Sequence, residues 1–190
     1  KNIASALSKR KILRGDTVSV LLLNTPAMLE VHYGVPMCGA VLHAINTRLN
    51  ATVIAYQLDH SDSKILIYDK ELRSVANQAL SIAKVSPELI EYTDNQCDYS
   101  DHIDENNNPI KEAVDYEKFI ETGDNNFQWL KPEDEWDAIS VGYTSGTTGN
   151  PKGVVSHHRG AYLLAQGNAL IASMEKHSVY LWTLPMFHCN

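Results

Sequence analysis

Three stretches of the chain carry near-continuous apolar residues over the length of a β-strand. Residues 17–23 read Thr-Val-Ser-Val-Leu-Leu-Leu, residues 64–69 read Lys-Ile-Leu-Ile-Tyr-Asp, and residues 138–143 read Ala-Ile-Ser-Val-Gly-Tyr. The run of residues 17–23 has no polar face, which is typical of a strand that is buried on both sides of a sheet. The pattern therefore predicts three strands, the first of them buried on both faces.

Between these runs, apolar residues recur at helical spacing. The pattern predicts a helix in residues 1–13, which Gly15 and Asp16 end, and a second helix that begins at Pro26. Further helices are predicted around residues 54–58, over residues 71–84 and from Gly160 onward. Strands that alternate with helices of this length indicate an α/β fold built of parallel-sheet subdomains with flanking helices.

Composition narrows the classes of function. Of the 190 residues, 44% are hydrophobic and 21% charged, as in a globular protein, and the net charge is −7. This charge argues against nucleic acid as a partner, and no apolar run reaches the ~18 residues of a membrane span. Cys38, Cys97 and Cys189 are odd in number and far apart, which favours a reducing compartment over a disulfide framework. No pair has zinc-site spacing, so no protein-held metal site is expected.

Acidic residues and asparagines gather in one stretch within residues 88–135. This stretch, residues 95–108, is predicted to be an exposed loop. Counted from Asp101, a calcium-binding loop would need glycine where Asn106 stands, so a calcium site is not expected.

The most informative motif follows the third predicted strand. Residues 143–153 read Tyr-Thr-Ser-Gly-Thr-Thr-Gly-Asn-Pro-Lys-Gly. Glycines let backbone N–H groups approach a phosphate closely, the hydroxyl groups donate hydrogen bonds, and Lys152 adds a mobile positive charge. The simplest interpretation is a loop that grips a polyphosphate and connects a strand to a helix.

Two rival interpretations exist for this motif. The phosphate-binding loop of nucleotide hydrolases needs Gly-Lys followed by Ser or Thr, whereas Lys152 lies between Pro151 and Gly153. A flexible linker with a chance lysine is the other, but the motif has strongly apolar segments on both sides.

The motif resembles the phosphate-loop signature of the adenylate-forming superfamily, which includes acyl-CoA synthetases, luciferases and adenylation domains of peptide synthetases. Residues 182–190, Trp-Thr-Leu-Pro-Met-Phe-His-Cys-Asn, are similar to the Pro-Met-Phe-His segment of acyl-CoA synthetases. Residues 34–49 resemble the helix-to-strand crossing near the start of these enzymes. Together the three segments resemble plant acyl-activating enzymes, over nearly the whole chain.

The resemblance implies a two-step reaction. A carboxylate attacks the α-phosphorus of ATP and releases pyrophosphate, and the thiol of CoA then displaces AMP from the acyl-adenylate. It also implies that the β- and γ-phosphates are held by Thr144, Ser145, Gly146, Thr147, Thr148 and Gly149, and that Lys152 pairs with them. Mg²⁺ is expected on the phosphates, with its protein ligand outside this chain.

His188 is the second candidate catalytic residue, because the matching residue of acyl-CoA synthetases borders the carboxylate pocket. Phe187 either walls the acyl pocket or belongs to the core. His157, His158 and Arg159 follow the loop, but adjacent histidines point in different directions, so at least one is expected to cap a helix or face solvent. Isolated histidines elsewhere are expected to be structural, and Trp129, Trp136 and Trp182 are expected to lie in the core.

Both ends look cut, so the chain is expected to be residues 1–190 of a partial AMP-binding N-terminal domain, without the C-terminal domain. We then expect little or no ligase activity from the chain alone. A truncated, inactive fragment that binds nucleotide weakly is the alternative. A luciferase-like or peptide-synthetase member is a third option, which the Pro-Met-Phe-His segment disfavours. The expected location is intracellular, in cytoplasm or peroxisome.

Overall fold

The fold is organised by strands whose successive side chains enter two different cores. A computed structural model describes residues 1–99, 108–144 and 150–188. In β3 (Ser63–Asp69), Ile65 and Ile67 enter one apolar cluster, whereas Leu66 and Tyr68 enter another. This alternation is the period of two expected of a strand that is buried on both faces.

The described strands form one sheet in the order β5-β4-β3-β1-β2-β6-β7. Besides β3, these are β1 (Thr17–Leu21), β2 (Val41–Ala44), β4 (Glu88–Tyr92), β5 (Val114–Asp115), β6 (Ala138–Thr144) and β7 (Lys152–His157). Neighbouring strands are parallel except β6 and β7, which are antiparallel. The predicted α/β class is confirmed, with this one antiparallel pair as an addition.

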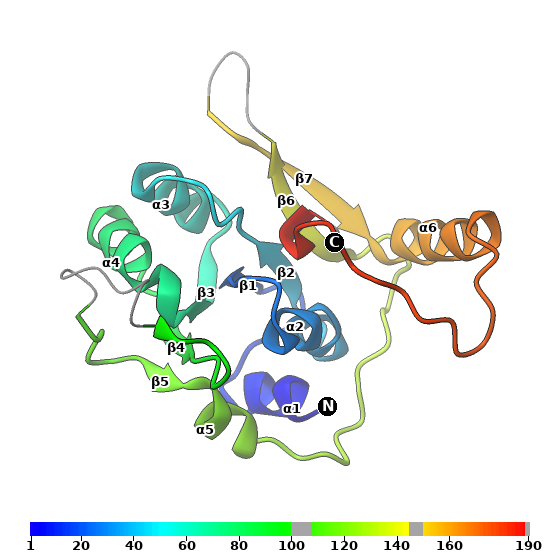
Figure 1. Cartoon of the computed structure of the whole chain (residues 1–190), viewed down its shortest axis with the longest axis horizontal. Helices are drawn as coiled ribbons and strands as arrows, with labels where there is room; N and C mark the ends of the chain where they lie inside the picture. Colours follow the sequence, from blue (N-terminus) through cyan, green and yellow to red (C-terminus); the bar gives the residue numbers. More distant parts are fainter. Residues whose placement is uncertain (100–107, 145–149, 189–190) are drawn as a thin grey trace.

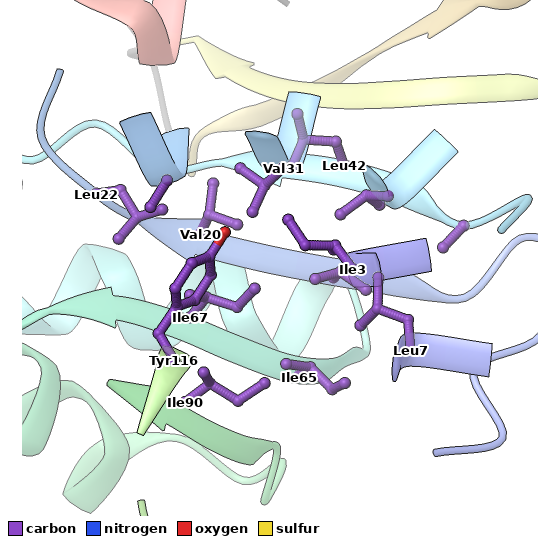
Figure 2. Packing of buried hydrophobic residues seen from close by; sticks show 14 of the residues in the cluster. Ile3, Leu7, Val20, Leu22, Val31, Leu42, Ile65, Ile67, Ile90 and Tyr116 are labelled. Carbon is purple, nitrogen blue, oxygen red and sulfur yellow. The ribbon is translucent and has the colours of Figure 1, made fainter. Parts of the chain in front are cut away.

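Helices cover both faces of the sheet (Figure 1). One cluster packs α1 (Asn2–Lys9), α2 (Pro26–Met37) and α5 (Tyr116–Glu121) against the strands, and Figure 2 shows Ile3 and Leu7 of α1 in the same cluster as Ile65, Ile67 and Tyr116. The other cluster packs α3 (Ala51–His60) and α4 (Arg73–Ile82), which follows the short helix η1 (Lys70–Leu72). None of the helices in the described ranges is long and apolar enough to cross a membrane.

The prediction for the polyphosphate loop is wrong in one respect: a strand separates the loop from the helix. β7 follows Pro151, and α6 (His158–Ile171) begins only after it. Val154 and Val155 give β7 its strand-forming character, and pairing with β6 satisfies its backbone groups.

The described residues leave α6 and the chain that follows it largely uncovered (Figure 1). α6 buries no side chain, and Leu170 and Ile171 are 81% and 88% exposed. The expectation that the tryptophans lie in the core is wrong, because Trp129, Trp136 and Trp182 are 51%, 62% and 41% exposed. An apolar surface of this extent marks an interaction site.

Candidate functional site

The β6–β7 hairpin forms the frame of the candidate phosphate site. Thr144, the last residue of β6, pairs with Lys152, the first residue of β7. The loop between them therefore leaves and returns at directly opposite positions, with the Thr144 and Lys152 side chains at its two ends. Ser145, Gly146, Thr147, Thr148 and Gly149 lie outside the described residues, so the structure does not test their predicted roles.

Two side chains of α3, one helical turn apart, contact the hairpin next to the loop. The Tyr56 hydroxyl donates to the carbonyl oxygen of Pro151 at 3.3 Å, and His60 Nδ1 lies 2.7 Å from the Tyr143 hydroxyl. Burial raises the pKa of Tyr143, so its hydroxyl is protonated near pH 7. Because Pro151 and Tyr143 belong to the two sides of the hairpin, α3 fixes both ends of the loop.

Buried polar side chains that are hydrogen-bonded to one another lie next to Tyr143. The His43 ring packs 5.0 Å from the Tyr143 ring, and its Nδ1 lies 2.8 Å from the Ser19 hydroxyl. On its other side, Nε2 lies 3.3 Å from the Gln57 carbonyl oxygen. Burial lowers the pKa of His43 to about 4, so the ring is neutral near pH 7 and offers these hydrogen bonds one donor and one acceptor nitrogen.

A cavity of about 220 Å³ lies between this hairpin and the C-terminal segment. Thr144 and His188 both line it, as do the neutral amide of Gln57 and the ring of Phe187. Thr144 and the nearby Ala44 stand at the carboxyl ends of β6 and β2, which run parallel. Ligands of α/β proteins bind at this edge of the sheet. The structure thus brings together two of the predicted site residues.

His188 ends the short helix η3 (Met186–His188), and its ring is exposed. The preceding Phe187 is 8% exposed and belongs to the core cluster, while its ring also lies 4.4 Å from that of His188. Phe187 therefore belongs to the core and also lines the cavity. His188 is anchored by a core residue and turned toward the cavity.

Lys152 is exposed and forms no ion pair with the acidic side chains of the described ranges. Its ammonium group is therefore available to an anion.

The histidine expected to cap a helix is confirmed as His157, whose Nδ1 accepts from the Gly160 N–H at 2.9 Å. Its ring packs against Trp136 and does not line the cavity.

The chemistry of the described donors suits an anion better than a cation. Within residues 1–99, 108–144 and 150–188, no three His, Cys, Asp or Glu side chains are grouped closely enough to hold a metal ion. Cys38 and Cys97 are free thiols, and Cys189 lies outside the described residues. Hydroxyl, amide and ammonium donors are what a phosphate or carboxylate requires.

Sequence reasoning missed Tyr56, Gln57 and the role of His60. Tyr56 and His60 have the spacing of neighbours on one helix face, a signal that exists in the sequence. Nothing in the sequence indicates, however, that this face meets a hairpin much later in the chain. The hydrogen bond between His60 and Tyr143 joins positions that are 83 residues apart.

Comparison with known proteins gives a family match over the full chain. The sequence pattern described as AMP-binding enzyme matches residues 1–190. The chain is 48% identical to the peroxisomal acetate/butyrate–CoA ligase of Arabidopsis thaliana, and all of it is covered. It is 46% identical, again over its whole length, to the acetate–CoA ligase of Humulus lupulus. The chain spans about a third, 34%, of the length of each of these relatives.

Solved structures agree in fold. The long-chain-fatty-acid–CoA ligase of Archaeoglobus fulgidus superposes with a TM-score of 0.78 at 21% identity, covering 98% of this chain and 34% of that one. The o-succinylbenzoate–CoA synthetase of Bacillus subtilis, solved with its acyl-adenylate intermediate, gives a TM-score of 0.72 at 22% identity, covering 98% of this chain and 41% of that one. At such identities the likeness establishes the architecture alone.

Proposed function

This chain belongs to the AMP-binding enzyme family, and on that premise we propose that it is part of an ATP-dependent carboxylic acid–CoA ligase. In this proposal a carboxylate oxygen attacks the α-phosphorus of ATP and the bond to pyrophosphate breaks. The thiol sulfur of CoA then attacks the acyl carbonyl carbon, and AMP leaves. The names of the relatives, which are acetate–CoA and acetate/butyrate–CoA ligases, support this assignment.

The observation that carries the proposal is the hairpin that places Thr144 opposite Lys152 at the two ends of the glycine- and hydroxyl-rich loop. We assign Thr144, Ser145, Gly146, Thr147, Thr148 and Gly149 to the β- and γ-phosphates of ATP. Lys152 neutralises part of their charge. Repulsion between the attacking carboxylate and the phosphates is a large part of the barrier, so fixed donors at this position lower it.

We assign His188 to the carboxylate of the acid substrate. It faces the same cavity as Thr144, so a group seated on its imidazole lies beside the end of the phosphate loop. A neutral imidazole donates one hydrogen bond to a carboxylate, and a protonated one also pairs with its charge. In this arrangement His188 orients the nucleophile and Thr144 holds the leaving group.

Mg²⁺ belongs to this proposal as the ion that the ATP phosphates carry. The described residues offer no cluster of three ligands for it. When bound, Mg²⁺ neutralises phosphate charge, and the residues of this chain bind the phosphates around it. The partners are thus ATP, CoA and a small carboxylic acid, and the net charge of −7 gives no support to nucleic acid as a further partner.

We propose that residues 1–190 form a partial N-terminal domain and that the rest of the ligase covers its exposed apolar surface. Two observations support this. The relatives are about three times as long, and α6 with the chain after it exposes Leu163, Leu164, Leu170, Ile171 and Leu181. For location we propose the interior of the cell, in cytoplasm or peroxisome, since the Arabidopsis relative is named as peroxisomal.

Pyrophosphate release with ATP, CoA and a panel of acetate, butyrate and benzoate tests the function. We expect acid-dependent release from the full-length protein that carries this chain, and little or none from residues 1–190 alone. Silence from the full-length protein with every acid would refute the ligase assignment. It would favour the alternative, an inactive fragment with at most weak nucleotide binding. Robust turnover by residues 1–190 would instead refute the proposed partial domain.

A further inference from the structure

The chain that leads to His188 has few contacts of its own. Val179 is 99% exposed and Leu181 82% exposed, and both belong to the long segment between α6 and η3. The position of His188 therefore depends on the contacts at the end of this segment. Phe187 and the partly buried Met186 are apolar contacts there, but apolar packing alone does not fix the direction of the backbone.

Asn24 supplies a second anchor through both ends of its amide. Its Oδ1 accepts a hydrogen bond from the Met186 N–H at 2.8 Å, and its Nδ2 donates to the Leu184 carbonyl oxygen at 2.8 Å. These two backbone groups flank Pro185, so one side chain fixes the chain direction immediately before His188. The asparagine offers the same pair of one donor and one acceptor that a neighbouring strand would offer.

Asn24 itself stands on a rigid base. It lies between the end of β1, which pairs with a strand on each side, and Pro26, with which α2 begins. Leu22 is 1% exposed, and the Thr25 N–H donates to the Leu23 carbonyl oxygen at 2.8 Å. The backbone on both sides of Asn24 is therefore held in place.

We propose that Asn24 is a positioning residue that aligns His188 with the candidate carboxylate site. This inference rests on the proposed function, in which His188 seats the acid. Asn24 is itself exposed, so water replaces its hydrogen bonds when they are lost and the fold as a whole depends little on them. The chain before the segment that Asn24 holds is exposed at Val179 and Leu181, so the loss falls on the position of His188.

The test is a double-mutant cycle in the full-length protein, with Asn24→Ala, His188→Ala and the double variant. We expect Asn24→Ala to lower kcat/KM for the acid about tenfold, the effect of losing one to two modest hydrogen bonds, with KM for ATP unchanged. We expect the double variant to be no worse than His188→Ala, because Asn24 acts through His188. Asn126→Ala, at another exposed asparagine, is the matched control and should leave all constants unchanged.

Each other outcome decides between the two claims. Fully additive losses in the double variant, or equal losses for acid and ATP, would overturn the role of Asn24 and leave the ligase assignment standing. No effect of His188→Ala on the acid would overturn the role of His188 itself. If Asn24→Ala lowers Tm markedly, Asn24→Asp replaces it, since aspartate keeps the acceptor for Met186 and replaces the donor to Leu184 with a second acceptor oxygen. That variant should then give the same non-additive loss, and an acid kcat/KM equal to that of the unmodified protein would refute the proposal.

Discussion

Replacing Lys152 by alanine removes the one positive charge that the proposed phosphate site draws from β7. The structure sets the magnitude, because the ammonium group is exposed and has no acidic partner in the described part of the chain. At about 4 Å, a pair of unit charges interacts with ~1 kcal/mol in water and ~4 kcal/mol at a protein surface. The variant should therefore lose between about fivefold and several hundredfold in kcat/KM for ATP, and we expect about thirtyfold.

The assay is pyrophosphate release by the full-length protein at low and moderate ionic strength. Lys64→Ala is the matched control, since Lys64 is also a strand lysine but pairs with Asp62 at 2.6 Å. It should leave kcat/KM for ATP within about twofold, because exposed ion pairs contribute little. If Lys152→Ala also stays within this range, or loses as much at high salt as at low salt, Lys152 does not hold the phosphates.

Two further predictions concern stability and the base of the hairpin. Burial raises the pKa of Asp69 to about 6, so the folded state keeps a proton that the unfolded state releases near pH 4, and stability falls as pH rises through this window. The free energy of unfolding, measured with urea, should fall by ~2 kcal/mol between pH 4 and 6, and Asp69→Asn should abolish this fall. The same pH dependence in both proteins would contradict this. Tyr56→Phe removes the donor to Pro151 and should lower kcat/KM for ATP about threefold. Tyr33→Phe, at an exposed tyrosine of α2, should have no effect, and equal behaviour of the two variants would argue against a role for α3.

β1, β3 and β6 could be predicted because their sequences are mostly apolar, whereas the buried strand β2 was indicated only by the resemblance of residues 34–49. The predicted runs at residues 17–23, 64–69 and 138–143 correspond to β1, β3 and β6. β7 was missed because Gly153 follows Pro151 and Lys152, a composition typical of a loop, and only pairing with β6 makes it a strand. β5 has only two residues and lies at the edge of the sheet, and β4 beside it is partly exposed, so neither shows a continuous apolar pattern.

The site could be predicted only where its residues are neighbours in the sequence. Thr144 and Lys152 stand at the ends of one motif, and His188 belongs to another. The supporting residues could not be predicted, because Tyr56, His60 and Asn24 act on backbone or side chains 83 to 162 positions away. These contacts depend on the order of the strands in the sheet, and a local sequence pattern does not reveal that order.

The central claim is that the loop between β6 and β7 holds the triphosphate of ATP. A crystal structure of the full-length protein with a non-hydrolysable ATP analogue tests it most directly. We predict that the β- and γ-phosphates lie within hydrogen-bond distance of the loop backbone, with Lys152 Nζ beside them and the Thr144 hydroxyl donating to an oxygen. A triphosphate bound elsewhere, with this loop empty, would contradict the claim.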